Sequence, residues 1–326
     1  MKRVLAADVG GTKSWLEVLE RRDGVWTPVL DRRYESALFP DCDSLLREFL
    51  AMTGPVDAAC LAVAGPVVAG GAHVTNLRWN IVAERLTEAF SIPRTLLVND
   101  FYAVAAGVPL LGPDDLVAVN DRPRDPAGSI AILGAGTGLG EALVIPTDGD
   151  WQILPSEGGH ADFAPSTAEQ DGLLAHLRAR YGHVSWERVL SGSGLVNIFT
   201  YLRDARPDLA PSDFTDGFEG HDFAAAIAEH DAKGNLLARA TFDVFIDVYG
   251  AEAGNAAVRA LTSGGVFLAG GICAKNASRF TDGRFLEAYA AKGRFRDMLL
   301  GWPVYVIMNP RVGLIGAAHL ATRLGE

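Results

Sequence analysis

The chain has 326 residues, of which 49% are hydrophobic and 21% are charged. This length exceeds what a single hydrophobic core usually supports, so we expect two lobes. Acidic residues outnumber basic ones by 40 to 29, which gives a net charge of −11, and no block of lysine and arginine is present. The charge therefore argues against nucleic acid or an anionic membrane surface as a partner.

The cysteines and the apolar runs predict a cytoplasmic protein. Cys42, Cys60 and Cys273 are far apart and form no C-x-x-C pair, which argues against a disulfide framework or a cysteine-rich zinc site. The apolar run Val4–Ala7 is too short for a signal peptide before Asp8 interrupts it. Because no apolar window reaches the length of a transmembrane helix, we expect no membrane partner.

Residues 4–19 read as a β-hairpin with an unusual turn. Glycines at a hairpin turn have a simple structural explanation, since such turns need positive φ angles. Here a carboxylate, backbone amides and a hydroxyl come together, and that set suits phosphate and its Mg²⁺ ion, held by the Asp through water. The Walker pattern does not apply, because threonine replaces the glycine it needs before lysine. The turn residues are Asp8, Val9, Gly10, Gly11, Thr12 and Lys13.

Strands then alternate with helices, which indicates a βαβ sheet. We expect helices at 41–52, 83–90 and 101–106, strands at 58–64 and 94–98, and a polar loop at 74–81. Asn99 and Asp100 follow the strand 94–98, at the carboxyl end where open α/β sheets bind ligands. One interpretation is catalytic; the other is that Asp100 only caps the following helix.

A second hairpin, at 129–145, repeats the plan of the first. An apolar strand, a turn of glycine and threonine around Gly136, Thr137 and Gly138, and another apolar strand follow one another, as in an internal duplication. The turn fails the dinucleotide fingerprint, because Leu139 or Glu141 replaces the third glycine and a strand follows instead of a helix. Two such turns would hold the two ends of one triphosphate.

Two further clusters are candidates for ligand binding. Glu157 and His160 flank two glycines after a strand at 151–154, so a tight loop can aim both at one place; alternatively His160 is an ordinary hydrogen-bonded histidine. Glu187 belongs to a predicted helix, where it either binds a ligand or lies on a solvated surface. Gly264 and Gly265 precede a strand at 266–269, and Gly270 and Gly271 follow it.

Gly270-Gly271 at a strand end would let an adenine or ribose approach the backbone. The alternative is that the two glycines only connect a strand to a helix. The region 191–261 is mainly helical by pattern. A last strand, 304–308, leads to a closing helix, 313–323, that returns to the first lobe.

The ordered motifs resemble the bacterial glucokinase family. They are A-D-V-G-G-T (7–12), T-N-L-R-W (75–79), V-N-D-F (98–101), G-A-G-T-G-L-G (134–140), S-E-G-G-H-A-D-F-A-P (156–165), G-H-V-S-W-E-R-V-L-S-G-S-G-L (182–195), L-A-G-G-I (268–272) and the ending N-P…G-A-A-H-L. The resemblance implies the two-lobed actin-like ATPase (ribonuclease H-like) α/β fold, with a cleft between the lobes. The smaller α/β lobe would hold 1–108 and 302–326, and the larger α+β lobe 109–301.

The resemblance also implies an activity, the ATP-dependent phosphorylation of D-glucose to glucose 6-phosphate, the first step of glycolysis. Asp100 corresponds to the general base and Asp8 to an outer ligand of Mg²⁺. The implied sugar ligands are Asn99, Glu157, His160, Glu187 and Gly138. The implied ATP ligands are Asp8, Gly10, Gly11, Thr12, Lys13, Gly136, Thr137, Gly265, Gly270 and Gly271.

Two departures from the family pattern matter. Lys13 stands where this group more often has Asn, and lysine is typical of a related sugar-kinase and repressor family. That other family carries a cysteine-rich zinc motif, whereas residues 161–186 hold no cysteine and no DNA-binding domain is expected before Asp8. We therefore assign the zinc-free group.

Three alternatives remain: a kinase for another hexose or an N-acetylhexosamine, a non-catalytic sugar sensor, and an actin-like ATPase. Homodimers are common among relatives.

Overall fold

The computed structural model describes residues 2–74, 77–209 and 223–326; residues 75–76 of the T-N-L-R-W motif lie outside these ranges. The chain forms two compact units, residues 1–112 with 309–326, and residues 113–308. The sequence placed the boundaries earlier, after residues 108 and 301. The second boundary differs because strand β14 (Val304–Ile307) pairs with β13 (Gly265–Ala269) and so belongs to the second unit.

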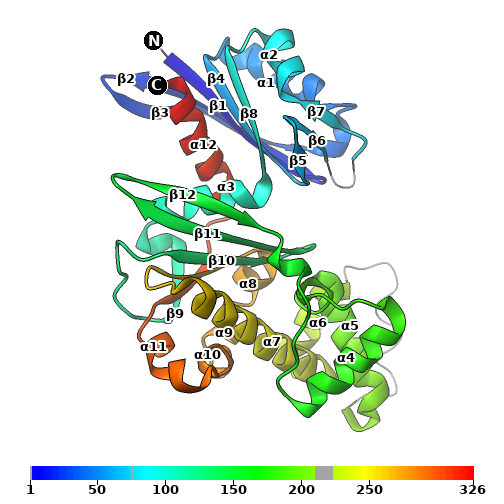
Figure 1. The fold of residues 1–326 in the computed structure, drawn as a ribbon. Coiled ribbons are helices and arrows are strands. Elements are labelled where there is room, and N and C mark those ends of the chain that lie inside the picture. Colours follow the sequence, from blue (N-terminus) through cyan, green and yellow to red (C-terminus); the bar gives the residue numbers. More distant parts are fainter. Residues whose placement is uncertain (1, 75–76, 210–222) are drawn as a thin grey trace. The chain divides into compact units, whose positions relative to one another are not determined.

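A five-stranded sheet of order β3-β2-β1-β4-β8 forms the centre of the first unit (Figure 1). Strands β1, β2 and β3 are antiparallel neighbours, whereas β4 and β8 run parallel to β1. The predicted hairpin and βαβ arrangement are therefore confirmed. The strands are β1 (Lys2–Val9), β2 (Lys13–Arg22), β3 (Val25–Glu35), β4 (Ala58–Val63) and β8 (Arg94–Asn99).

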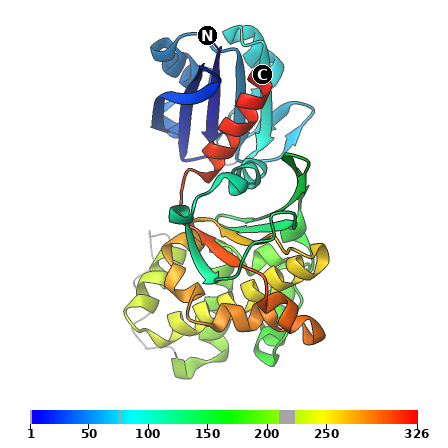
Figure 2. The same ribbon diagram turned by 90° about the vertical axis from the view of Figure 1, so that its left-hand side faces the viewer.

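Helices cover both faces of this sheet (Figures 1 and 2). Because strand side chains alternate between faces, residues 5, 7 and 9 of β1 pack against α1 and α2. Residues 4 and 6 pack against α3 and α12. Asp8, the next even-numbered residue, therefore points to the side of α3 and α12. The helices are α1 (Cys42–Thr53), α2 (Ala83–Phe90), α3 (Asp100–Gly107) and α12 (Val312–Gly325).

The closing helix α12 packs directly on α3. A Cβ atom on Gly316 would overlap with the carbonyl oxygen of Ala103, and one on Gly107 would overlap with that of Val312. Glycine at both positions lets the two helices approach closely. In the same unit, part of the loop expected at 74–81 instead joins a small antiparallel sheet of β5 (Val67–Val68), β6 (Gly71–His73) and β7 (Asn80–Val82).

The second unit contains a six-stranded sheet of order β12-β11-β10-β13-β14-β9. Here too the first three strands are antiparallel, and β13 and β14 run parallel to β10. The same order and directions as in the first unit agree with an internal duplication, and β9 is an addition on the edge, antiparallel to β14. The remaining strands are β9 (Leu116–Asn120), β10 (Ile130–Ala135), β11 (Leu139–Thr147) and β12 (Asp150–Ser156).

The helices of this unit share one large hydrophobic core with the sheet. The central helix α7 (Leu236–Ala260) has buried residues along nearly its whole length, because the sheet and other helices surround it. Around it are α4 (Ala168–Tyr181), α5 (Gly192–Ala205), α6 (Phe223–Ala232), α8 (Gly271–Lys275), α9 (Ala277–Phe280), α10 (Arg284–Ala290) and α11 (Arg296–Leu300). Among the described helices, none is both long and apolar enough to cross a membrane.

Candidate active site

Asp8 and Asp100 lie at the carboxyl edge of the first-unit sheet. Asp8 is the last but one residue of β1, and Asp100 follows β8 as the first residue of α3. Strand β4 separates β1 from β8, and its Ala62 pairs with Asp8 on one side and with Val98 on the other. Parallel strands bring their carboxyl ends to one edge, which is where ligands bind in open α/β sheets.

Both carboxyl groups have raised pKa values, and the charge of Asp100 contributes to that of Asp8. Burial and the charge of Asp100 together raise the pKa of Asp8 to about 6. Burial also raises the pKa of Asp100, although the backbone amide of Phe101 donates to its carboxylate at 2.8 Å and partly offsets this. Partly desolvated carboxylates near a like charge are typical of functional sites, because burial and the like charge both disfavour ionisation.

Asn99 is the residue that caps helix α3. Its side-chain oxygen accepts the amides of Phe101 at 2.9 Å and Tyr102 at 3.3 Å, and its side-chain amide donates to the carbonyl of Gly65 at 3.1 Å. The N-cap is therefore Asn99, and Asp100 is the first residue of the helix; a catalytic role for Asp100 stays a prediction. The Asn99 side chain also hydrogen-bonds to the carboxylate of Asp100, which lowers the pKa of that carboxyl and so offsets part of the effect of burial.

A short turn, residues 10–12, connects β1 to β2 and is held from one side by Ser36. The Gly10 amide donates to the carbonyl of Lys13 at 3.1 Å. Ser36 donates its amide to the Thr12 carbonyl at 2.9 Å and its hydroxyl to the Gly10 carbonyl at 2.8 Å. Thr12 and the side chain of Lys13 are exposed. The fully buried Ser36 was not singled out in the sequence, because a lone serine after a strand carries no motif.

The equivalent turn of the second unit, Gly136-Thr137-Gly138, carries a carboxylate. The Gly136 amide donates to the Gly138 carbonyl at 2.9 Å, and the Glu187 carboxylate accepts the Leu139 amide at 3.0 Å. A Cβ atom on Gly138 would overlap with that carboxylate. Glycine at 138 is thus needed for Glu187 to reach the turn. Glu187 lies in a short 3₁₀ turn (Trp186–Arg188) and is half-buried, so the solvated-surface interpretation is wrong.

Glu157 and His160 project into solvent from a 3₁₀ turn that packs on β11. The carboxylate of Glu157 lies 3.8 Å from Nε2 of His160, and the two side chains are 86% and 61% exposed. Gly159 lies so close to the Leu139 carbonyl that a Cβ would overlap with it. Glu187 holds the amide of the same Leu139. The structure therefore gathers the four predicted sugar ligands of this unit, Gly138 included, around the first residue of β11.

The glycines at the two ends of β13 lie far apart. Gly270 has a φ angle of +94°, and a Cβ atom on it would overlap with the carbonyl oxygen of Ala135, the last residue of β10. Gly270 therefore lies beside the turn 136–138. Gly265 pairs with Ile130 at the opposite end of β10. At about 3.3 Å per residue, the length of this strand separates Gly265 from the turn. Gly270 and Gly271 thus lie beside the turn 136–138 and Gly265 does not; the predicted ATP contacts of all three stay predictions.

The chain was compared with known proteins at this point. The glucokinase family model matches residues 5–324. The glucokinase of Nostoc punctiforme is 41% identical, with 99% of this chain and 100% of that protein covered. The chain belongs to the glucokinase family. The crystal structure of a glucokinase from an Antarctic psychrotroph, 31% identical, superposes with a TM-score of 0.87 over 99% of both chains.

A more distant member confirms the fold. A ROK family glucokinase from Streptomyces griseus, crystallised with glucose and AMPPNP, is 21% identical and has a TM-score of 0.61, with 98% of this chain and 99% of that one covered. At this identity the likeness shows the shared fold alone. Together these matches confirm the predicted family and the actin-like kinase fold, while the roles of individual residues stay predictions.

Tyr249 of α7 is a member of this region that the sequence did not reveal. Its hydroxyl donates to the Leu133 carbonyl at 3.0 Å and accepts the amide of Ala135 at 3.2 Å. Strand β13 pairs with β10 only as far as Gly134, so this buried hydroxyl provides the bond that β13 does not supply. Tyr249 thereby fixes the end of the strand that carries the turn 136–138. A tyrosine within an apolar helix gives no sequence signal for such a role.

The Asp8 region suits the Mg²⁺ ion that accompanies ATP. Among the residues described here, the Asp8 carboxylate has no ion-pair partner, and it faces the like charge of Asp100. A divalent cation would relieve this repulsion. Magnesium in kinases is usually bound through one or two carboxylates together with substrate phosphates. The donor set therefore fits the ion.

Proposed function

We propose that this chain transfers the γ-phosphoryl group of ATP to the 6-hydroxyl of D-glucose, with Asp100 as the general base. The observation that supports this most is the placement of Asp100 beside Asp8 at the carboxyl edge of the first-unit sheet, with the helix cap provided by Asn99. The family membership supports the same reaction, since the relatives are named as glucokinases.

Asp100 has the properties that a base for a sugar hydroxyl needs. A hydroxyl is a weak nucleophile, and its proton must leave as the bond to phosphorus forms. The raised pKa of Asp100 makes its carboxylate a stronger proton acceptor, while the Phe101 amide keeps the charged form accessible. General-base action contributes about 10²–10⁴-fold. Phosphoryl transfer obtains the rest from position and electrostatics.

The two turns would hold the phosphates of ATP. In the first unit, Gly10, Gly11 and Thr12 would present amides and a hydroxyl, and the exposed Lys13 would add a positive charge. In the second, Gly136, Thr137, Gly270 and Gly271 are close together at one edge and would receive the rest of the nucleotide. When bound, Mg²⁺ neutralises charge on the phosphates, with Asp8 as its outer ligand through water.

Glu157, His160 and Glu187 would bind the sugar hydroxyls, together with Asn99. Carboxylates accept hydrogen bonds from hydroxyl groups, whereas histidine and the amide can also donate. Discrimination between epimeric sugars is large when these hydrogen-bonding side chains are buried, because the wrong epimer leaves one of the side chains without a hydrogen bond. Glucose phosphorylation would place the enzyme in the cytoplasm at the start of glycolysis.

The test measures ADP formation by the purified chain with ATP and Mg²⁺, with and without glucose. We expect turnover that requires glucose and a product identified by ³¹P and ¹³C NMR as the 6-phosphate. Mannose, fructose and N-acetylglucosamine serve as competing substrates, and polyphosphate replaces ATP as a second donor because of Lys13. Equal ATP hydrolysis without any sugar, or a clear preference for another hexose, would contradict the proposal.

A further inference from the structure

Glu141 is an acidic residue in an otherwise apolar row. Residues 139, 141 and 143 of β11 share one face, and Leu139 and Leu143 pack into the core that contains α7. Glu141 lies between them and is only 8% exposed. Burying an ionised carboxylate is costly, so an acid in such a position is either paired with a positive charge or neutral.

The carboxyl group of Glu141 lies directly beneath the turn that carries Glu157 and His160. A Cβ atom on Gly158 would overlap with its Oε2 atom, so the turn rests on this side chain. Its Oε1 atom is buried and, within the described residues, has no hydrogen-bond partner. Glu141 also borders a cavity of about 100 Å³, which is lined in addition by Ala131, Leu133, Ser156, Ala256 and Arg259.

The charged surroundings disfavour the ionised form. Burial and the charge of Glu252 on α7 raise the pKa of Glu141 to about 7, and Arg259 on the same helix opposes this. Arg259 is paired with Glu252 at 3.0 Å, which reduces its effect on Glu141. Lys292 acts on Glu252, and the neutral hydroxyl of Tyr249 is the remaining titratable neighbour. From the neighbouring strands and the turn, Leu133, Ser156 and Gly158 face Glu141 and carry no charge, whereas Glu157 and His160 of the turn are exposed to solvent.

We propose that Glu141, in its neutral form, is a positioning residue that holds the Glu157–His160 turn in its sugar-binding conformation. The part that concerns sugar rests on the proposed function; the part that concerns the turn does not. An ionised Glu141 has an unpaired buried charge beside Glu252, so it gains by moving toward water and no longer supports Gly158. The turn is therefore held at low pH and loosens as the pH rises past about 7.

The first experiment follows the turn itself by amide hydrogen exchange of the segment 157–161. In this segment the amides of His160 and Ala161 donate to the carbonyls of Glu157 and Gly158, both at 2.9 Å. We expect Glu141→Ala to lower their protection about tenfold, which corresponds to a local opening easier by about 1.4 kcal/mol. Unchanged protection would overturn the proposal, whatever the enzyme's activity.

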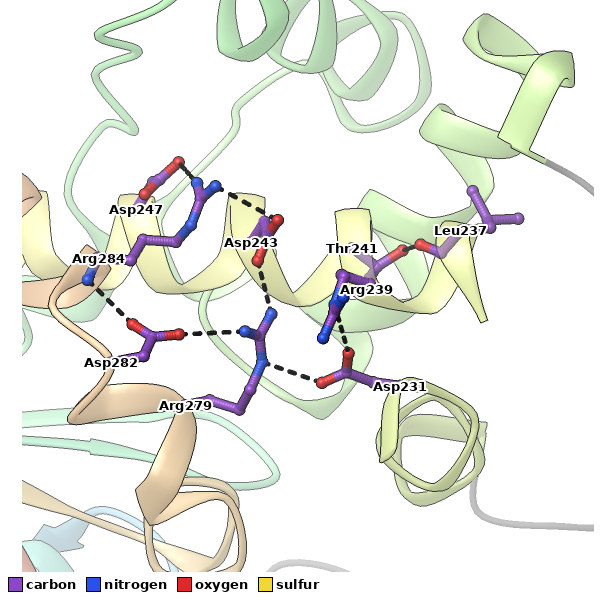
Figure 3. A network of polar contacts seen from close by, with 9 residues as sticks. All are labelled: Asp231, Leu237, Arg239, Thr241, Asp243, Asp247, Arg279, Asp282 and Arg284. Atoms are coloured by element: carbon purple, nitrogen blue, oxygen red, sulfur yellow. Dashed lines mark hydrogen bonds and ion pairs between the residues drawn. The ribbon is translucent and has the colours of Figure 1, made fainter. Parts of the chain in front are cut away.

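A control variant is available on the same helix that carries Glu252. Asp247 pairs with Arg284 at 2.6 Å, and burial raises its pKa as well. It belongs to a network of acidic and arginine side chains that joins α6, α7 and the segment 279–284 and includes no residue of the Glu157–His160 turn (Figure 3). Asp247→Ala should therefore lower stability without changing exchange at 157–161. Equal loss of protection in both variants would show that Glu141 acts only through overall stability, which would overturn the proposal.

The second experiment compares glucose KM between pH 6 and pH 8.5 in the wild type and in Glu141→Gln. The wild-type KM should rise about tenfold over this range, because the ionised fraction of Glu141 grows. Glutamine mimics the neutral acid, so the variant should keep the low-pH KM throughout, with KM for ATP changed less than about twofold in both proteins. Parallel pH profiles would overturn the proposal, while a lack of any glucose turnover in the wild type would instead overturn the proposed function.

Discussion

The two units repeat one backbone plan but differ in the side chains at the corresponding edge. Each has three antiparallel strands followed by two parallel ones, and in each a three-residue turn joins the first two strands. Counted from the last paired residue of the first strand, Asp8 of β1 corresponds to Gly134 of β10. The first unit therefore presents acids at this edge, and the second presents glycine.

This difference separates the proposed roles. In the first unit the end of β1 and the start of α3 supply Asp8 and Asp100, which suit a metal ion and proton transfer. In the second unit the sheet edge offers backbone at residues 136–138 and 270–271, and its acids come from the short turns at 157–160 and 186–188. The duplicated topology thus keeps both turns, while the acids near them come from different elements in the two units.

The largest effects on the kinetic constants are expected from replacing one acid in each unit, Asp100 in the first and Glu187 in the second. Asp100→Asn should lower kcat by about 10²–10⁴-fold, with glucose binding changed much less, because it removes the base. Glu187→Gln keeps an acceptor for the Leu139 amide but loses a charged sugar ligand. It should raise glucose KM by about 10- to 100-fold, since hydrogen bonds to charged groups contribute about 1.5–3 kcal/mol. Steady-state kinetics and calorimetric glucose titration distinguish the two; a fall in kcat alone for Glu187→Gln would contradict the division of roles.

The next comparison is between the first glycines of the two turns. A Cβ on Gly10 would lie 2.8 Å from the Lys13 carbonyl, whereas one on Gly136 would meet nothing within 4 Å. Gly10→Ala should therefore lower the free energy of unfolding by about 1–3 kcal/mol and raise ATP KM, because the crowded turn must shift. Gly136→Ala should leave stability nearly unchanged. Chemical denaturation measures both, and equal losses would mean that the two turns are under the same constraint.

The last comparison concerns how the first strand of each unit ends, and its effect is limited to stability. In the first unit β4 pairs with β1 as far as Val9, whereas in the second unit Tyr249 provides the bond to Ala135. Tyr249→Phe leaves that amide unpaired and should cost about 1–3 kcal/mol of unfolding free energy. Tyr289 is the control, because its buried hydroxyl has no hydrogen-bond partner within the described residues. Tyr289→Phe should be neutral or stabilising in thermal denaturation; a loss equal to that of Tyr249→Phe would show that the Tyr249 bonds contribute nothing specific.

Much of the first unit could be predicted because its signals are local. The apolar runs of β1 and β4 and the helix at 83–90 follow from periodicity, and the predicted hairpins end within a few residues of the observed strands. Strand β3 was missed, since it is an edge strand with mostly exposed side chains and little apolar alternation. The distance of Gly265 from the turn 136–138 could not be predicted, because a glycine pair looks the same at either end of a strand.

The amino-acid sequence by itself determined the family, the two hairpin turns and the residues that gather around them, because these depend on short patterns of glycine, acid and apolar residues. Only the tertiary structure decided which side chains meet. It gave the helix cap to Asn99, brought Glu187 onto the amide of Leu139, and placed Glu141 under Gly158. Each of these depends on contacts between residues far apart in the chain, and such contacts are set by strand pairing and packing.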